Sequence, residues 1–200
     1  MMSGAAKLLL ITFSMIFTEN YVLVQFLGIC PFLGVSKKLD SSLGMSGAVI
    51  FVMTLASAVT WLVYTFIMVP LGLEYLNTII FILVIAALVQ FVEIVLKKYM
   101  RGLYDALGVY LPLITTNCAV LAVTLLNIEE NYNFLESVVD GLTAGVGFGL
   151  ALILFSGVRK ALERAKPPKP FEGLPITLIA AALTSMTFMG FVGIADKLFG

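Results

Sequence analysis

Long stretches without a charged residue constrain the fold of this chain more than any other feature. They include residues 41–73, 106–128, 141–158 and 173–195, which are 18 to 33 residues long. A helix that crosses a bilayer needs about 20 mostly apolar residues. Of the 200 residues, 60% are hydrophobic and only 12% are charged, about half the usual charged fraction of soluble domains. We therefore expect an all-α integral membrane protein.

The apolar segments and the turns between them predict six transmembrane helices in one membrane domain, residues 1–200. Proline-containing turns at residues 70–72 and 166–170 separate some of the segments, because proline ends a helix. None of the connections is long enough to form a separate domain. The predicted spans cover residues 8–29, 44–69, 75–96, 103–127, 137–158 and 173–195.

The basic residues are segregated along this predicted topology. The loops after the first, third and fifth spans contain ten of the twelve Lys and Arg residues. Because Lys and Arg concentrate in cytoplasmic loops, we expect these loops at the cytoplasmic face of a bacterial inner membrane, with both termini outside. The predicted spans would be surrounded by membrane lipid. The net charge of the chain is zero, which gives no indication of nucleic acid as a partner.

Two similar segments contain the only two cysteines of the chain. Residues 30–36 read Cys-Pro-Phe-Leu-Gly-Val-Ser, and residues 118–124, 88 positions later, read Cys-Ala-Val-Leu-Ala-Val-Thr. The same shift aligns the first span with the fourth and the second with the fifth. Three spans per repeat is an odd number, so the second repeat (about 101–200) is inverted relative to the first (about 1–100).

An inverted repeat makes a geometric prediction for Cys30 and Cys118. Equivalent positions lie at equal and opposite depths, so the two cysteines can meet only near the bilayer midplane. Straight helices would prevent this, because Cys118 lies about 16 residues, or about 24 Å, beyond the start of the fourth span. We therefore expect the first helix of each repeat to be broken, with Gly28, Pro31 and Pro112 as helix breakers. Irregular backbone at this depth must be buried in protein or line a wet cavity.

Three interpretations of the two cysteines remain open from the residues alone. They are small buried hydrophobic side chains, a disulfide, or thiolate ligands of the soft kind that suits iron–sulfur clusters. Their position in matching segments beside helix breakers favours ligands. Because such a cluster normally takes four cysteines, the ligand interpretation requires a second protein that supplies two more, most simply a homologue.

Several segments of the chain resemble a known family. They are residues 18–38 around Cys-Pro-Phe-Leu-Gly, residues 81–93, residues 111–121 with Leu-Pro-Leu-Ile-Thr-Thr-Asn-Cys, and Phe-Met-Gly-Phe at 188–191. The chain is similar throughout to the membrane subunits of the Rnf and Nqr ion-translocating oxidoreductases. The Cys-Pro-Phe-Leu-Gly form fits the A subunits of the Rnf branch better than the E subunits of the sodium-pumping NADH:quinone reductases.

The resemblance implies one component of a ferredoxin–NAD oxidoreductase that is coupled to Na⁺ or H⁺ transport and is not catalytic alone. It implies that Cys30 and Cys118 hold half of an intramembrane [2Fe-2S] cluster, which relays electrons across the membrane. A homologous six-helix subunit of the E type would supply the other two cysteines. The B, C, D and G subunits of an Rnf complex are the further partners implied.

Two carboxylates are candidate ion or proton sites. Glu19 lies near the middle of the first predicted span, where an ionisable group is costly. It would share a face with Cys30 if the helix continued. The alternative is a carboxyl group that is hydrogen-bonded to another helix or protonated. Glu93 is the second candidate, with an i,i+4 pair to Lys97 as its alternative.

Polar and small residues beside these positions have two interpretations each. Thr115, Thr116 and Asn117 are candidate hydrogen-bond donors to cluster sulfurs, or helix caps and cross-links. Gly145, Gly147 and Gly149 indicate close helix packing, with a phosphate-binding role as the alternative. A different class of function also remains open, a stand-alone ion transporter built on the inverted repeat, in which the cysteines are incidental.

Overall fold

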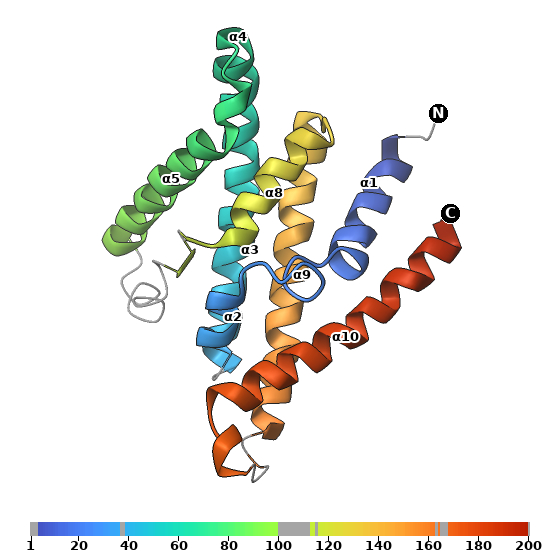
Figure 1. The fold of residues 1–200 in the computed structure, drawn as a ribbon. Coiled ribbons are helices and arrows are strands. Elements are labelled where there is room, and N and C mark those ends of the chain that lie inside the picture. The colour runs from blue at the N-terminus through green and yellow to red at the C-terminus, as the bar shows by residue number, and fades with distance from the viewer. Residues whose placement is uncertain are drawn as a thin grey trace.

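Two long helices form the centre of the molecule. The computed structural model describes residues 4–36, 39–99, 113–114, 116–162, 164 and 168–199, and every regular element in these ranges is a helix. Helices α3 (Leu39–Val63) and α9 (Phe134–Leu162) run side by side through the middle of Figure 1. α3 continues through a π-helical turn, η2 (Tyr64–Met68), into the short α4 (Val69–Leu71).

The remaining helices pack around this pair. α8 contacts α3, α5 and α9, while α1 and α10 lie beside α9 and α5 forms the opposite edge (Figure 1). The elements are α1 (Gly4–Phe13), η1 (Ser14–Thr18), α2 (Ile29–Val35), η3 (Glu74–Leu76), α5 (Asn77–Tyr99), α8 (Cys118–Glu129), η5 (Lys169–Phe171) and α10 (Leu174–Phe199).

Among the residues that the structure describes, three helical segments are long and apolar enough to cross a membrane, Ser41–Leu71, Asn77–Val95 and Phe134–Leu162. They confirm the second, third and fifth predicted spans, with ends that differ by a few residues. Two shorter apolar helices, Cys118–Glu129 and Leu174–Gly190, lie in the predicted fourth and sixth spans. Residues 103–112 of the fourth span lie outside the described residues. The first predicted span, 8–29, is not one helix, because helical structure stops at Thr18 and resumes at Ile29.

The basic last turn of α9 and the acidic connection from α8 to α9 lie at opposite ends of the bundle (Figure 1). The last turn of α9, with Arg159 and Lys160, lies at the lower end in Figure 1, where α10 begins. The connection from α8 to α9, which carries Glu129 and Glu130, lies at the upper end. α1 begins and α10 ends in this upper half, away from the basic end of α9.

A row of glycines on α9 permits the central contact. A Cβ atom on Gly145 would lie 2.8 Å from the Ile50 Cα, and one on Gly149 would lie 3.0 Å from the Ser46 Cβ. A Cβ on Gly147 would lie 2.9 Å from the Met15 carbonyl oxygen. The predicted packing role of these glycines is therefore confirmed. Their hydrogen atoms are the only side groups that fit between α9 and the backbones of α3 and η1.

We expect Gly145→Ala to destabilise the chain by about 1–3 kcal/mol, the usual cost of inserting a methyl group into a packed contact. The midpoint of thermal unfolding in detergent measures this effect. Gly157→Ala is the matched control, because it is on the same helix and nothing lies within 4 Å of a Cβ there. The control should unfold at the wild-type temperature or slightly above it, since alanine favours a helix over glycine. Equal midpoints for both variants would contradict the packing role.

Candidate metal centre

The first predicted span is interrupted by an ordered, non-helical segment. η1 ends at Thr18, and the backbone N–H of the next residue, Glu19, donates to the Ser14 carbonyl at 2.7 Å. Residues 19–28 then form turns, and Phe26 and Gly28 have positive φ values of 57° and 76°. The predicted break is therefore present, and it starts nine residues before Gly28.

Asn20 organises the backbone of this break and is fully buried. Its Nδ2 donates to the carbonyls of Ile16 at 3.2 Å and Gly147 at 2.9 Å. Its Oδ1 accepts from the N–H groups of Val22 at 3.1 Å and Leu23 at 3.3 Å. One amide side chain thus supplies partners for four backbone groups in and around the interrupted helix. This matches the requirement that irregular backbone at membrane depth be satisfied by protein.

Both cysteines lie in the first turn of a helix that follows a break. Cys30 is the second residue of α2, which begins after the left-handed Gly28. Cys118 is the first residue of α8, where the Asn117 side chain caps the helix by accepting from the Ala119 N–H at 3.0 Å. The capping interpretation of Asn117 is therefore confirmed.

The two cysteine segments are in direct contact through Gly28. A Cβ atom at this position would lie 2.7 Å from the Asn117 Oδ1 and 3.3 Å from the Ala119 Cβ. Asn117 and Ala119 are the two neighbours of Cys118 in the chain. The structure thus brings together the two segments that the sequence comparison matched, although they are 88 residues apart.

Both thiols are free and exposed. Within this chain, the described structure therefore contains neither a disulfide between them nor a buried thiol. On α2, the buried residues are Pro31, Phe32 and Val35, and the Phe32 ring stacks on Phe155 with centroids 4.4 Å apart. Because α2 buries this face, Cys30 is left on the open side of the helix.

Two free, exposed thiols could supply part of the ligand set of a metal cluster. Among the described residues, no three Cys, Asp or Glu side chains gather into a metal site, so the thiols of this chain supply at most a partial ligand set. The Asn117 Nδ2 is buried and has no hydrogen-bond partner in the described structure. Asn117 precedes Cys118 in the chain, and its amide remains a candidate donor to sulfur. Thr116 is exposed and takes part in another interaction, and Thr115 lies outside the described residues.

Arg159 fixes the far end of α2. Its Nη1 donates to the Leu33 carbonyl at 2.6 Å and to the Ser36 Oγ at 2.8 Å. A cation at the C-terminal end of a helix also interacts favourably with the helix dipole. The helix that carries Cys30 is therefore attached to α9 at one end and to the start of α8 at the other.

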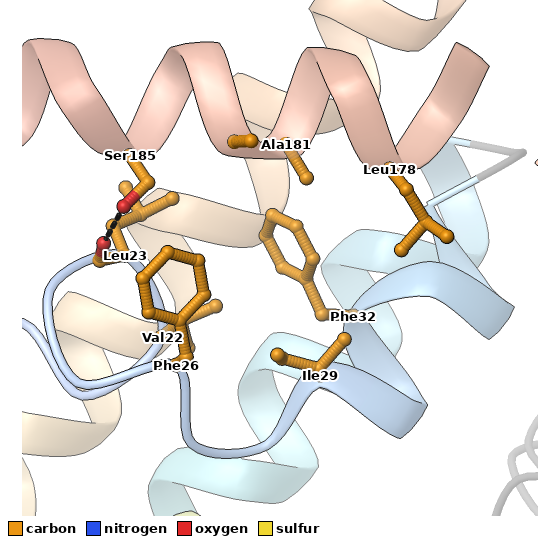
Figure 2. A pocket seen from close by; sticks show the side chains of 9 residues that line it. Val22, Leu23, Phe26, Ile29, Phe32, Leu178, Ala181 and Ser185 are labelled. Carbon is orange, nitrogen blue, oxygen red and sulfur yellow. Dashed lines mark hydrogen bonds between the residues drawn. The ribbon is translucent and has the colours of Figure 1, made fainter. Parts of the chain in front are cut away.

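α10 contacts the break across an apolar pocket. Figure 2 shows Phe32 pointing from α2 toward Leu178 and Ala181 of α10. The Ser185 hydroxyl donates to the Leu23 carbonyl, which gives one more backbone group of the break a partner. The pocket lining is completed by Val22, Phe26, Ile29 and Ala182.

The two candidate carboxylates occupy different environments. Glu19 is exposed at the start of the break, and because the helix stops there, the predicted shared face with Cys30 does not form. Glu93 is half-buried on α5, one turn before Lys97, and no described contact joins it to either cysteine. Its pairing with Lys97 stays a prediction.

The sequence reasoning missed three residues with clear structural roles, Asn20, Arg159 and Asp140. Asp140 is fully buried, with both carboxylate oxygens unpartnered among the described residues. A signal was available for it, because it lies inside the predicted fifth span, where any ionisable residue is a functional candidate.

Comparison with known proteins agrees with this architecture. A family described as "Rnf-Nqr subunit, membrane protein" matches residues 8–195. The chain is 56% identical over 186 residues to the A subunit of the Na(+)-translocating ferredoxin:NAD(+) oxidoreductase complex of Acetobacterium woodii, covering 93% of this chain and 97% of the relative. It is 55% identical to the A subunit of the ion-translocating oxidoreductase complex of Aliivibrio salmonicida, covering 93% and 96%. The chain therefore belongs to the Rnf-Nqr family of membrane-protein subunits.

Proposed function

We propose that this chain is the A-type membrane subunit of an Rnf-type ferredoxin–NAD oxidoreductase and holds half of an intramembrane [2Fe-2S] cluster. One observation carries the proposal: two free, exposed thiols begin two helices whose starts touch through Gly28 and Asn117. The names of the relatives, which are A subunits of ion-translocating oxidoreductase complexes, support the choice of complex.

The chemistry of the two helix starts suits thiolate ligands. Cys118 is the first residue of the 12-residue α8, at the positive end of the helix dipole, where negatively charged groups bind favourably. The unpartnered Asn117 amide adds a hydrogen-bond donor beside it, and such donors tune the reduction potential of a cluster. When bound, the cluster supplies one-electron transfer. The protein contributes the two ligands and a rigid attachment through Arg159 and Asn20.

A second chain must complete the ligand set, because a [2Fe-2S] cluster takes four ligands. A homologous six-helix subunit of the E type, with its own pair of cysteines, is the simplest donor. The inverted repeat predicted from the sequence is consistent with this arrangement, since such a repeat would bring equivalent cysteines to the midplane of each protein. In the complete complex, with subunits of the B, C, D and G types, the cluster would pass electrons across the membrane during Na⁺ or H⁺ transport.

The charge distribution supports an orientation with both termini outside the cytoplasm. The last turns of α5 and α9 carry Lys97, Lys98, Arg159 and Lys160. The connection from α8 to α9 carries acidic residues instead. Because cytoplasmic loops are rich in Lys and Arg, the basic ends would face the cytoplasm of a bacterial inner membrane.

In the complex co-expressed with the partner protein, we expect Cys30→Ser and Cys118→Ser each to remove the cluster. The hydroxyl of serine is a poor substitute for a soft thiolate. The measurements are iron and acid-labile sulfide content and the electron paramagnetic resonance signal of the reduced complex, with electron transfer lost in parallel.

Gly47→Ser is the control for these variants. It introduces the same hydroxymethyl group at an exposed position on α3 where nothing lies within 4 Å of a Cβ. It should retain iron, sulfide and signal. Full electron transfer in the double variant without either cysteine would rule out the proposed role and favour a stand-alone transporter.

The orientation has a separate test. Alkaline phosphatase fused to the C-terminus should be active in cells, and green fluorescent protein at the same place should be dark, because both reporters would lie outside the cytoplasm. A fluorescent green fluorescent protein fusion and an inactive alkaline phosphatase fusion would show that the C-terminus lies in the cytoplasm. That result would contradict the proposed orientation but not the proposed cluster.

A further inference from the structure

Gln25 places a polar side chain on the surface of the molecule at the depth where a membrane is most apolar. It belongs to the break in the first predicted span, and its side chain is exposed. Residues on both sides of it fix its depth. Asn20 donates to the Gly147 carbonyl at 2.9 Å, and a Cβ on Gly28 would lie 2.9 Å from the Phe148 ring. Both contacts are midway along α9, which is long and apolar enough to cross a membrane, so Gln25 lies near the middle of that span.

The backbone around Gln25 holds this side chain in place. The Leu27 N–H donates to the Tyr21 carbonyl at 2.7 Å, and the N–H of Gln25 itself donates to the Asn20 carbonyl at 3.4 Å. Phe26, the next residue, lines the apolar pocket against α10 (Figure 2) and has a φ of 57°, which is rare for a bulky side chain. The exposure of Gln25 therefore follows from the ordered turns of the break.

Lipid cannot satisfy a carboxamide at this depth. The hydrocarbon core offers no hydrogen bonds, so a polar group that faces it without a partner is strongly disfavoured. Non-helical backbone at membrane depth is tolerated only where protein or a wet cavity covers it. The break at Gln25 is non-helical, polar and exposed. This part of the surface therefore calls for a cover that supplies hydrogen-bonding groups.

Gln25 borders the region of the two exposed thiols. Cys30 lies five residues further along the chain and is exposed. Between them, Gly28 lies directly against Asn117, the neighbour of the exposed Cys118. Because two thiols supply only half of the ligands of an iron–sulfur cluster, the chain that completes the ligand set must approach this region. That chain is the nearest source of partners for Gln25.

Asn20 shows what an amide does in this segment. Its carboxamide donates to two backbone carbonyls and accepts from two backbone N–H groups. Gln25 carries the same group on a side chain that is one methylene longer, with two N–H donors and one acceptor oxygen. It can therefore pair with the backbone of an interrupted helix in a neighbouring chain. A homologue that repeats this fold would present such a helix at the same depth.

We propose that Gln25 is a recognition residue for a homologous membrane subunit. Its carboxamide hydrogen-bonds to the exposed backbone of the interrupted helix in that partner, near the midplane of the membrane. The inference rests on the proposed function only for the existence of this partner. The contact does not involve the cluster, so partner binding through Gln25 does not require iron.

The test uses the complex co-expressed with the homologous subunit and isolated through an affinity tag on this chain. We expect Gln25→Leu to raise the apparent dissociation constant of the partner by about three- to tenfold, the range for one hydrogen bond between membrane helices. The measurement is the amount of partner retained during serial dilution in detergent. Gln90→Leu is the matched control, because it makes the same change at an exposed position of α5, two turns before Lys97. It should retain the partner as the wild type does, and equal weakening by both variants would contradict a specific contact.

A cross-link gives a measurement that does not depend on affinity. A photoreactive group is attached at Gln25→Cys in a chain that also carries Cys30→Ser and Cys118→Ser. Illumination should link position 25 to the partner subunit without any cluster present. If Gln25→Leu reduces the amount of folded chain, this cross-link decides the outcome.

The results separate this contact from the proposed cluster. Labelling of lipid or solvent alone, with equal partner retention in Gln25→Leu and wild type, would overturn the inference, even where Cys30→Ser still removes the iron. Weaker partner retention in Gln25→Leu, together with full iron content in Cys30→Ser, would contradict the cluster and support the contact at Gln25.

Discussion

The buried amide of Asn20 makes the interrupted helix possible. At membrane depth, each unpaired backbone group costs several kcal/mol, so an open segment of chain is tolerated only with substitute partners. Asn20 provides four of them, to Ile16, Val22, Leu23 and Gly147. Because these bonds join the break to α9 as well as to its own ends, the break is a fixed element. The break leads directly into α2, so the Asn20 amide also helps to position the start of α2 and Cys30.

The central pair of helices provides the frame to which the break is attached. α3 and α9 approach closely because Gly141, Gly145 and Gly149 leave no side chains between them. α9 also contacts the cysteine region at two places. Its Gly147 carbonyl accepts from Asn20 in the break, and Arg159 near its end donates to the end of α2. The same helix carries Asp140. One rigid element therefore positions both the exposed thiols and the buried carboxylate, which lie in different parts of the bundle.

The sequence allowed prediction of features that depend on composition over many residues. The second, third and fifth spans follow from length and absence of charge, and the helix break follows from the need to bring Cys30 and Cys118 together. The start of the break at Glu19 was not predictable, since it depends on which carbonyls the Asn20 amide meets. The partners of Arg159 and the isolation of Asp140 likewise depend on contacts between residues far apart in the chain.

The double constraint at Gly28 limits how this protein can change over evolutionary time. Any other residue there would adopt a backbone conformation with φ near 76° that side chains disfavour. Its Cβ would also meet the Asn117 Oδ1 at 2.7 Å. Shortening Asn117 would still leave that Cβ 2.9 Å from the Phe148 Cε2 and would remove the cap of α8 in the same step. No single substitution at Asn117 therefore compensates for the loss of Gly28. Replacing Gly28 would pass through a variant in which the contact between the two cysteine segments is disturbed.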